Sequence, residues 1–556
     1  MIDAKQIIER YDALKTLRSS CEDRWKRVAR YVMPQRSAPG GEPALFDTTA
    51  VRANQTLANG QLAWMSPMES SWFDYAAPKD ADDEAKLWLS RCTDGARTAL
   101  AISNFYTTVH EFYLDRSAFG IGCLYIEPGK HGGLMVQSWP PGTYVIDEDA
   151  NGEVDTLFRE FSLSARQAAQ KFGEENLSEG LRKKLKDEKL KHEKSWFIHG
   201  IYPREERDTE KVDAANMPWV SVYVEKDGNH IVRESGYDEQ PFAVSRFLVW
   251  SSDEKFNGEN TAAMYGWTPA FAAVADARQL NHIERCQDAI AEREAFPPVL
   301  VPDELEGEID PNPHGVTLFS ASMASSGAMP KTWMTGGKYE IGVQRAEVKR
   351  EAIRQAFLVD LFQMFAQIQK QMTATEVAER AQEKLIQFSQ TFARLTTELF
   401  EPVLARVFGI LLRGGGFGPL DKIPQSLMRQ IDAENVEIPV PKVVYSSRIA
   451  LALRAQPTLG YQRAIGRMAE VAQMAPDVID NYDFDRAERA TALNDGISAD
   501  YLRKTSEVKK MREARAAAAA QREQMEQQER AAASLGKVGG IKSDSMVGQA
   551  ITGATQ

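Results

Sequence analysis

Three short motifs contain residues that could do chemistry, and each lacks a part that the chemistry needs. "VHEFYLDR" begins like the zinc-binding motif HExxH, but Leu114 stands where the second histidine ligand belongs. "FGIGCLY" has two glycines of a dinucleotide-binding GxGxxG, with Tyr125 in place of the third. "WMTGGKYE" places Lys338 after two glycines, without the other residues of a phosphate-binding loop. We therefore expect His110 to be an ordinary helical histidine and the glycines Gly120 and Gly122 to form a tight turn.

Acidic clusters and cysteines are the remaining candidates. "DADDEAK" and "VPDELEGEID" could bind a divalent cation, and solvated acidic loops are the alternative. The cysteines lie far apart and form no CxxC, which favours buried free thiols in a reduced compartment over a disulfide or zinc framework. The histidines are scattered, and no GxSxG or GK[ST] motif occurs. The sequence therefore predicts no catalytic residue, no cofactor and no metal, and a protein that is not an enzyme.

Length and charge narrow the class of protein. A chain of 556 residues is too long for one ordinary core, so we expect two to four structural units. No run approaches the roughly 20 apolar residues of a membrane span, and the polar start is unlike a signal peptide. We expect no membrane partner. The net charge of −12 argues against tight non-specific DNA binding, although it allows a surface along which DNA slides.

The elements that would position these residues are mostly helical. Apolar residues at three- and four-residue steps predict amphipathic helices. Over residues 117–250 the spacing of apolar residues changes to two, which predicts the strands of an α+β unit. This unit contains a charged helical insert at 165–194. A segment rich in Pro, Gly and Ser, 296–340, separates two later helices. The predicted helices are 1–35, 49–66, 84–117, 264–295 and 341–357.

The most strongly patterned stretch predicts one very long helix over 374–413. Thr373 and Glu376 fit a capping box, and a single apolar seam follows them. Pro402 should kink the helix because its ring clashes with the preceding turn, and three glycines from Gly414 should end it. Beyond a short β-like piece, we expect helices at 447–494 and 498–534 and a disordered tail over 535–556.

Five blocks occur in a fixed order along the chain. They are "FDTTAVRANQTLANGQLAWMSPMESSWFDYA", "FYLDRSAFGIGCLYIE", "ERCQDAIAEREAFPPVLVPDEL", "QMTATEVAERAQEKL" and "FEPVLARVFGIL". In this order the blocks resemble the head-to-tail connecting, or portal, proteins of short-tailed bacteriophages. The resemblance spans about residues 1–460, and the order of the blocks is more specific than any one of them.

The resemblance implies a mainly helical α+β portal fold that assembles as a ring, usually of twelve copies, at one capsid vertex. The central channel of such a ring passes double-stranded DNA. The expected parts are a wing (1–260, completed by 430–447), stem helices (264–295 and 341–357), a clip (296–340), a channel loop (358–373), a spine helix (374–413), and a crown with C-terminal helices (448–534).

The resemblance also implies partners. These are the terminase large subunit and then tail adaptor proteins at the clip, together with the major capsid and scaffolding proteins, in a virion assembled in the host cytoplasm. The alternatives are another virion ring or tail adaptor protein, which is usually shorter, and a DNA-processing enzyme.

If 341–357 is a stem helix, its cations are candidates for transient phosphate contact, and nearby glutamines could face the channel. The alternatives are ion pairs with Glu340, Glu347 and Glu351 or with neighbouring subunits, and ordinary loop polarity for the glutamines. The candidates are Lys338, Arg345, Lys349, Arg350, Arg354, Gln363, Gln367, Gln369 and Lys370.

Overall fold

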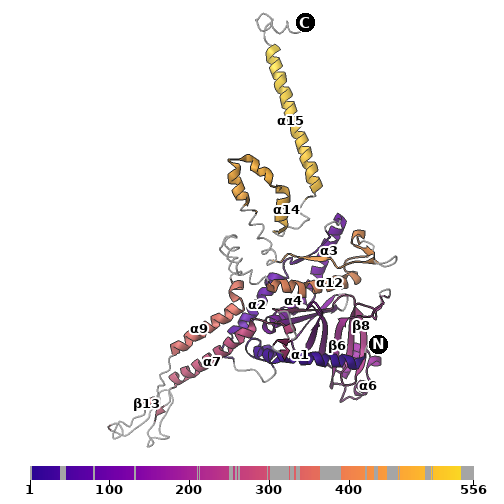
Figure 1. The fold of residues 1–556 in the computed structure, drawn as a ribbon, viewed down its shortest axis with the longest axis vertical. Coiled ribbons are helices and arrows are strands. Elements are labelled where there is room, and N and C mark those ends of the chain that lie inside the picture. Colours follow the sequence, from indigo (N-terminus) through magenta and orange to yellow (C-terminus); the bar gives the residue numbers. More distant parts are fainter. Residues whose placement is uncertain are drawn as a thin grey trace. The chain divides into compact units, whose positions relative to one another are not determined.

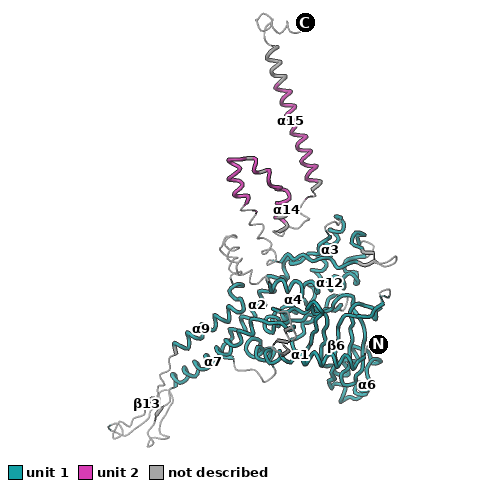
Figure 2. Tube along the Cα trace, viewed as in Figure 1, with its two compact units in different colours: residues 1–452 teal, residues 453–556 magenta. Residues whose placement is uncertain are grey.

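The computed structural model divides the chain into two units, residues 1–452 and 453–556, which are described separately below (Figure 2). The expectation of two to four units is met at its lower bound. Apart from a few isolated shorter stretches, the described residues are 3–37, 45–78, 82–129, 133–208, 213–249, 263–296, 339–363, 390–419, 423–430, 436–447, 464–494 and 505–539.

Two helices near the N-terminus follow the predicted pattern closely. Helix α1 (Ala4–Tyr31) begins where the Asp3 side chain accepts a hydrogen bond from the Lys5 amide. It ends four residues earlier than predicted, and the short 3₁₀ helix η1 (Pro34–Arg36) follows because Pro34 cannot continue an α-helix. Helix α2 (Thr49–Met65) ends within a residue of its predicted end.

The single helix predicted over 84–117 is wrong, because the structure has two helices there. Helix α3 (Asp83–Ile102) and helix α4 (Phe105–Phe119) meet at Asn104. The Asn104 side chain donates to the Val136 carbonyl at 2.7 Å and accepts from the Val136 amide at 3.0 Å. The helix is therefore interrupted at Asn104 because this side chain binds the backbone of an edge strand, at Val136, 32 positions further along the chain.

The turn after α4 depends on one of the two glycines named above. Gly120 caps the helix with φ of 83°, a left-handed conformation that favours glycine. Gly122 lies instead in strand β2 (Ile121–Pro128), so its assignment to the turn is wrong. A Cβ at Gly122 would lie 2.7 Å from the Phe112 ring, so close packing requires this glycine.

Two antiparallel sheets form the centre of the first unit (Figure 1). Strand β2 lies between β3 (Leu134–Trp139) and β9 (Phe242–Arg246). The larger sheet has the order β4-β5-β6-β7-β8. Its strands are β4 (Tyr144–Glu148), β5 (Val154–Ser164), β6 (Lys194–Pro203), β7 (Trp219–Glu225) and β8 (His230–Tyr237).

Helices cover both faces of the five-stranded sheet. Successive side chains of a strand point to opposite faces, so Ile198 packs under α1 while Phe197 packs under the other layer. That other layer consists of α5 (Ala165–Phe172) and α6 (Glu179–Lys186). The helical insert predicted at 165–194 is therefore two short helices, since Gly173 adopts φ of 89° between them.

A distant part of the chain joins the first unit through a small sheet. Strand β1 (Phe73–Ala76) pairs antiparallel with β16 (Lys442–Tyr445), with Phe73 opposite Tyr445. The Ser446 amide continues the pairing to the Trp72 carbonyl. Residues 442–446 thus belong to the same compact unit as the N-terminal helices.

A hairpin of two helices extends from the sheets of the first unit (Figure 1). Helix α7 (Ala270–Ala295) begins later than the predicted residue 264 because the 3₁₀ turn η4 (Ala263–Tyr265) and Gly266 precede it. Helix α9 (Tyr339–Ala356) matches its prediction within two residues. Of the segment between them, the structure describes mainly the two-residue strands β12 (Val299–Leu300) and β13 (Lys331–Thr332), which pair with each other.

Only the C-terminal part of the predicted long helix lies within the described residues. From Gln390 the chain is helical, passes through a π-helical turn at Thr396–Phe400, and continues as α12 (Glu401–Arg413). The irregularity therefore comes just before Pro402, where the wider π turn accommodates a residue without an amide donor. Gly414 caps α12, as predicted, and the proposed capping box at 373–376 lies outside the described residues.

The second unit contains α14 (Phe484–Asn494) and α15 (Thr505–Gly539). Arg512 pairs with Asp485 and links the two helices. Side chains of α15 from residue 509 to residue 530 are exposed, as expected for an alanine-rich helix with little to bury. The helix reaches Gly539, so the disorder predicted for residues 535–539 is wrong: one glycine at 536 costs only about 1 kcal/mol of helix stability.

Candidate functional site

Ion pairs and small side chains hold the α7–α9 hairpin together. Ala273, Ala277 and Leu280 of α7 are buried. Lys349 of α9 donates to Asp276 of α7 at 2.7 Å, and Arg350 donates to Glu284 at 2.6 Å. These contacts join the helices at two levels, so the pairs set the register of the hairpin.

Arg350 also ties the hairpin to the rest of the first unit. Its Nε donates to Asp47 at 3.0 Å, in the segment that leads into α2. The neighbouring Phe46 amide donates to Asn281 of α7 at 2.7 Å. The three carboxylates around Arg350, those of Asp47, Glu284 and Glu347, hold its guanidinium in place, and hydrogen bonding to Asp47 raises its pKa against the lowering effect of burial.

The other candidate DNA contacts are distributed differently. Arg354 pairs with Glu347 at 3.1 Å and Glu351 at 3.6 Å on its own helix. Arg345 is exposed and makes no hydrogen bond or ion pair with another described residue. Gln363 is exposed at the end of the helical segment after α9. The remaining candidates, Lys338, Gln367, Gln369 and Lys370, lie outside the described residues.

Exposed cations gather along α7 beside Arg345. A groove of about 1070 Å³ lies between this part of the hairpin and Tyr31 and Phe46. Arg278, His282 and Arg285 line it together with Arg345. The described residues that line this groove include arginines and no carboxylate. The side of α7 that faces the groove is therefore basic.

A buried arginine connects the sheets to the helix that ends at Arg413. Arg246, at the end of β9, is only 3% exposed. Its guanidinium donates to Glu398 in the π turn at 2.9 Å, to Glu148 of β4, and to the Gly152 carbonyl at 3.0 Å. Its own amide also donates to Glu398, at 2.7 Å. We call Arg246, Glu148 and Glu398 the arginine node.

Three further arginines, of which Arg116 and Arg406 are buried, bind the same part of the molecule. Arg116 of α4 donates to the Ser245 hydroxyl and to the Arg246 carbonyl, both at 3.0 Å. Burial lowers its pKa to about 10, which is high enough to keep it charged at neutral pH. Arg406 and Arg413 of α12 both donate to Glu239, at 2.9 Å and 2.7 Å. Glu239 on the α/β side thus binds this helix at two positions seven residues apart.

Asp115 is a buried carboxylate at the other side of the helical layer. Arg36 donates to both of its oxygens, at 3.1 Å and 2.8 Å. Burial raises the pKa of Asp115 to about 6, and the Arg36 guanidinium offsets part of that shift. The pair ties η1 to α4.

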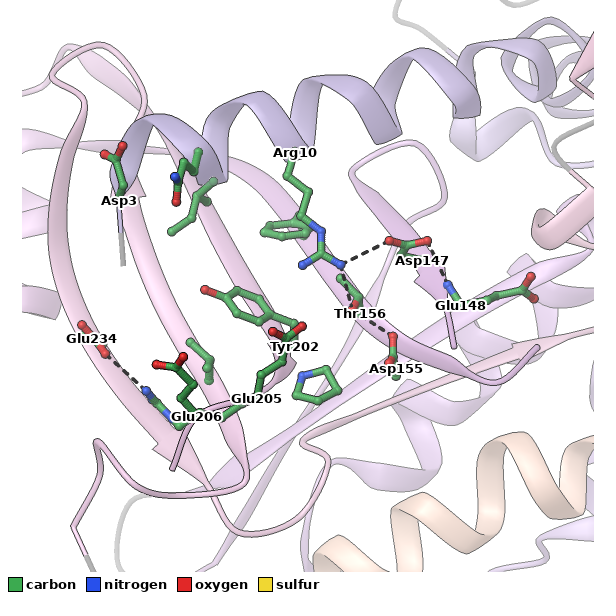
Figure 3. Close-up of a pocket in the computed structure, with 16 residues that line it drawn as sticks. Asp3, Arg10, Asp147, Glu148, Asp155, Thr156, Tyr202, Glu205, Glu206 and Glu234 are labelled. Atoms are coloured by element: carbon green, nitrogen blue, oxygen red, sulfur yellow. Dashed lines mark hydrogen bonds and ion pairs between the residues drawn. The ribbon is translucent and has the colours of Figure 1, made fainter. Parts of the chain in front are cut away.

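An acidic pocket of about 890 Å³ lies between α1 and the five-stranded sheet (Figure 3). Arg10 projects into it, donates to Asp147 at 3.2 Å, and lies 5.6 Å from the ring centroids of Phe158 and Tyr202. Arg204 pairs with Glu234 at 3.6 Å. The carboxylates that line the pocket are those of Asp3, Asp147, Glu148, Asp155, Glu205, Glu206 and Glu234.

The motifs examined for metal or nucleophilic chemistry have structural roles where they are described. His110 is hydrogen-bonded to Asn59, and Asp82 of "DADDEAK" caps α3 by accepting from the Ala85 amide at 2.9 Å. Among the residues that the structure describes, no three His, Cys, Asp or Glu side chains are grouped to hold a metal ion. The cluster "VPDELEGEID" lies outside them.

The thiols follow the expectation with one exception. Cys21, Cys92 and Cys123 are buried, and burial raises the pKa of the Cys92 thiol to about 12, which keeps it protonated. Cys286 is exposed on α7, so the expectation of burial is wrong for this residue. Its position on the helix points away from the seam with α9. Within the described ranges, no helix has the length and apolar character needed to cross a membrane.

These features define a structural scaffold: buried ion pairs join an α/β body to a helix, and partly exposed ion pairs hold a projecting two-helix hairpin. The chain belongs to the bacteriophage head to tail connecting protein family, whose model matches residues 4–502. The members of this family are structural connectors of the phage virion, situated between head and tail, and the function of this chain is that of a portal, or head-tail connector.

Two phage relatives agree with the family. The chain is 30% identical over 527 residues to the probable portal protein of Bordetella phage BPP-1, covering 92% of this chain and 91% of the relative. It is 25% identical over 530 residues to the portal protein of Salmonella phage epsilon15, with the same coverage. A solved chain from the virion of a native gene transfer agent particle aligns with 77% of this chain and 86% of its own length, at 13% identity and a TM-score of 0.30.

Sequence reasoning missed the arginine node and the ion pairs between Glu239 and the arginines of α12. One signal was present: Arg246 lies in the apolar run "PFAVSRFLVW", where a charge must be buried with a partner. Glu398 likewise interrupts an apolar helical seam. The pairing of the two could not be read from the sequence, since they are separated by 152 positions.

Proposed function

We propose that this chain assembles head to tail into a closed ring of twelve copies whose channel carries double-stranded DNA during packaging and ejection. The observation that supports this proposal most strongly is the match to the connector family over residues 4–502. A ring of this kind needs two different patches on each subunit, and it closes when the rotation between neighbours closes. During packaging we expect the terminase large subunit to dock on the ring, and tail adaptor proteins to dock on it later.

Within this proposal the segments take the roles expected above. The α/β body would be the wing that meets the major capsid and scaffolding proteins. The α7–α9 hairpin would be the stem, 296–340 the clip, and 358–373 the channel loop. The helix ending at Arg413 would be the spine, and residues 448–534 the crown and C-terminal helices.

The charges of the chain suit passage of DNA rather than retention. Each phosphate that Lys or Arg neutralises adds to affinity through counterion release, so a conduit needs few free cations. Lys349, Arg350 and Arg354 are engaged with carboxylates. We propose that their first role is to keep the hairpin rigid and that transient phosphate contact falls to the less engaged candidates. These are Lys338, Arg345, Gln363, Gln367, Gln369 and Lys370.

Heads assembled with a variant chain test the role in packaging. Arg345→Glu should leave assembly intact and slow DNA packaging several-fold, because it places a repelling charge beside the phosphates. Lys183→Glu on α6, which is also exposed, is a control with the same charge change. Equal packaging rates for the two variants would remove Arg345 from the channel.

The alternative of a DNA-processing enzyme has a direct test. The purified chain with DNA, ATP and Mg²⁺ should show no turnover, because packaging energy comes from the terminase in this account. Robust ATP or DNA hydrolysis by the chain alone would contradict the proposal.

A further inference from the structure

The two outward sides of the α7–α9 hairpin carry opposite charge. On α7, Arg278, His282, Arg285 and Arg293 are exposed on the side turned away from the buried Ala277 and Leu280. The exposed Glu292 lies among them, and the three arginines leave this side with a net positive charge. We call them the basic side. Arg278, Arg285 and Arg293 make no ion pair with another described residue.

The outward side of α9 is acidic and partly apolar. Glu340, Gln344, Glu347 and Glu351 recur at steps of four, three and four residues, opposite the buried Ala346 and Ile353. Arg354 pairs with Glu347 and Glu351 at one edge of this side and Arg345 lies at the other, so the three carboxylates leave a net negative charge. Beside them Ile341 is 52% exposed and Val348 is 68% exposed. We call this set, Glu340, Gln344, Glu347, Glu351, Ile341 and Val348, the acidic side. Large apolar side chains left this exposed on a helix flanked by charges are typical of a contact surface.

The register of the hairpin places matching charges at the same level. Lys349 lies beside Asp276, and Gly342 is so close to Gln287 that a Cβ would lie 2.8 Å from its amide nitrogen. From these two anchors, Glu351 lies at about the level of Arg278, and Glu347 at about the level of His282. Glu340 then lies between the levels of Arg285 and Arg293.

We infer that the acidic side of one subunit's α9 packs against the basic side of the next subunit's α7, so that a second copy of this chain occupies the part of the groove lined by Arg278, His282 and Arg285 and leaves Arg345 outside the contact. This inference rests on the proposed ring and deepens it by naming the contact. The two patches differ, lie on opposite sides of one hairpin, and complement each other, as a head-to-tail contact requires. Like charges would meet if α7 packed on α7 or α9 on α9, which disfavours two-fold pairing.

The groove beside α7 is concave as well as basic, so side chains of a neighbouring subunit could enter it. Its volume of about 1070 Å³, between α7 and residues Tyr31 and Phe46, accepts protruding side chains such as Val348 and the glutamates beside it. Exposed ion pairs contribute little individually, so burial of Val348 and Ile341 would carry much of the attraction while the charges select the partner surface.

A native thiol makes the contact testable. Cys286 is exposed on the outward half of α7, at about the level of Gln344. In Gln344→Cys each subunit carries one thiol on each side of the hairpin. Mild oxidation should then join neighbours in a ladder of covalent oligomers that exceeds dimers and ends at the complete ring. The ladder should vanish in Gln344→Cys combined with Cys286→Ser, because each bond needs both thiols.

Charge reversal supplies a second test that separates contact from folding. Arg278→Glu with Arg285→Glu, and Glu340→Arg with Glu351→Arg, should each abolish rings, and the four changes together should restore them. Lys183→Glu with Lys186→Glu on α6 alters the charge as much as the first pair and should leave rings intact. Failure of the four-fold variant to recover, with its helical content unchanged, would overturn the inference.

The outcomes separate this inference from the ring itself. Rings seen by electron microscopy without a covalent ladder would overturn the α9-to-α7 contact and leave the proposed function standing. Dimers alone that persist after Cys286→Ser would show α9 packing on α9, which also overturns it. Absence of rings from the unmodified chain, both purified and in particles made in cells, would overturn the proposed function.

Discussion

The α/β body and the α7–α9 hairpin use charge in opposite ways. In the body, Arg246 and Arg116 are buried and each contacts several partners. In the hairpin, Lys349, Arg350 and Arg354 pair while a quarter or more of each side chain remains exposed. The buried arginines of the body therefore find partners within one chain, whereas the outward sides of the hairpin leave charges and apolar groups exposed.

The largest effect should come from the arginine node. Arg246→Ala would leave Glu148 largely buried without a counter-charge and Glu398 with Arg394 as its remaining partner, which costs about 3–5 kcal/mol of unfolding free energy. Urea unfolding followed by tryptophan fluorescence measures this loss. A change below about 1 kcal/mol would show that the node does not hold the body to the helix, and the contrast with the hairpin would fail.

Asp115 tests the body through pH. Its folded pKa of about 6 exceeds the unfolded value of about 4, so the folded state holds the proton more tightly between these values. The contribution of Asp115 to the free energy of unfolding is most favourable below about pH 4. This contribution is lost as the pH rises through 6, by about 3 kcal/mol at most. Relative to Asp115→Asn, the native chain should lose stability from pH 4 to pH 7. Parallel stability profiles of the two chains would contradict the buried pair.

Gly60 tests the join between the two regions. A Cβ at this position of α2 would overlap the ring of Phe362, which follows α9 and is buried. Gly60→Ala should therefore destabilise by about 1–3 kcal/mol through overpacking. Thermal unfolding measures the change, with Gly180→Ala as the control, because a Cβ there meets only the Ser178 hydroxyl at 3.7 Å. A neutral Gly60→Ala would mean that the two segments are not packed together.

The smallest effects should come from the hairpin itself. Arg350→Ala removes partly exposed pairs and should cost about 1 kcal/mol, since solvent screens each one. Arg345→Ala, without a described partner, should change stability by less than about 0.5 kcal/mol. Chemical unfolding of both variants ranks them. An Arg350 cost as large as that of Arg246 would erase the difference between the two regions.

The parts predicted well from sequence are those governed by local pattern. The α2 helix, the α9 helix and the stop at Gly414 follow from periodicity and glycine chemistry that neighbouring residues supply. The break at Asn104 and the pairing of Arg246 with Glu398 depend on residues 32 and 152 positions away, which single-sequence patterns do not register. The sequence also could not separate the candidate DNA contacts that are paired from those that are not. The ion pairs of Lys349 and Arg350 become visible only when α7 and Asp47 are placed beside α9.

The central claim is that this chain builds a ring, and native mass with top-view electron microscopy of the purified protein tests it most directly. The account predicts closed rings with a central hole, and twelve copies of a 62.1 kDa chain give roughly 745 kDa. A dimer or tetramer with a closed centre would contradict it.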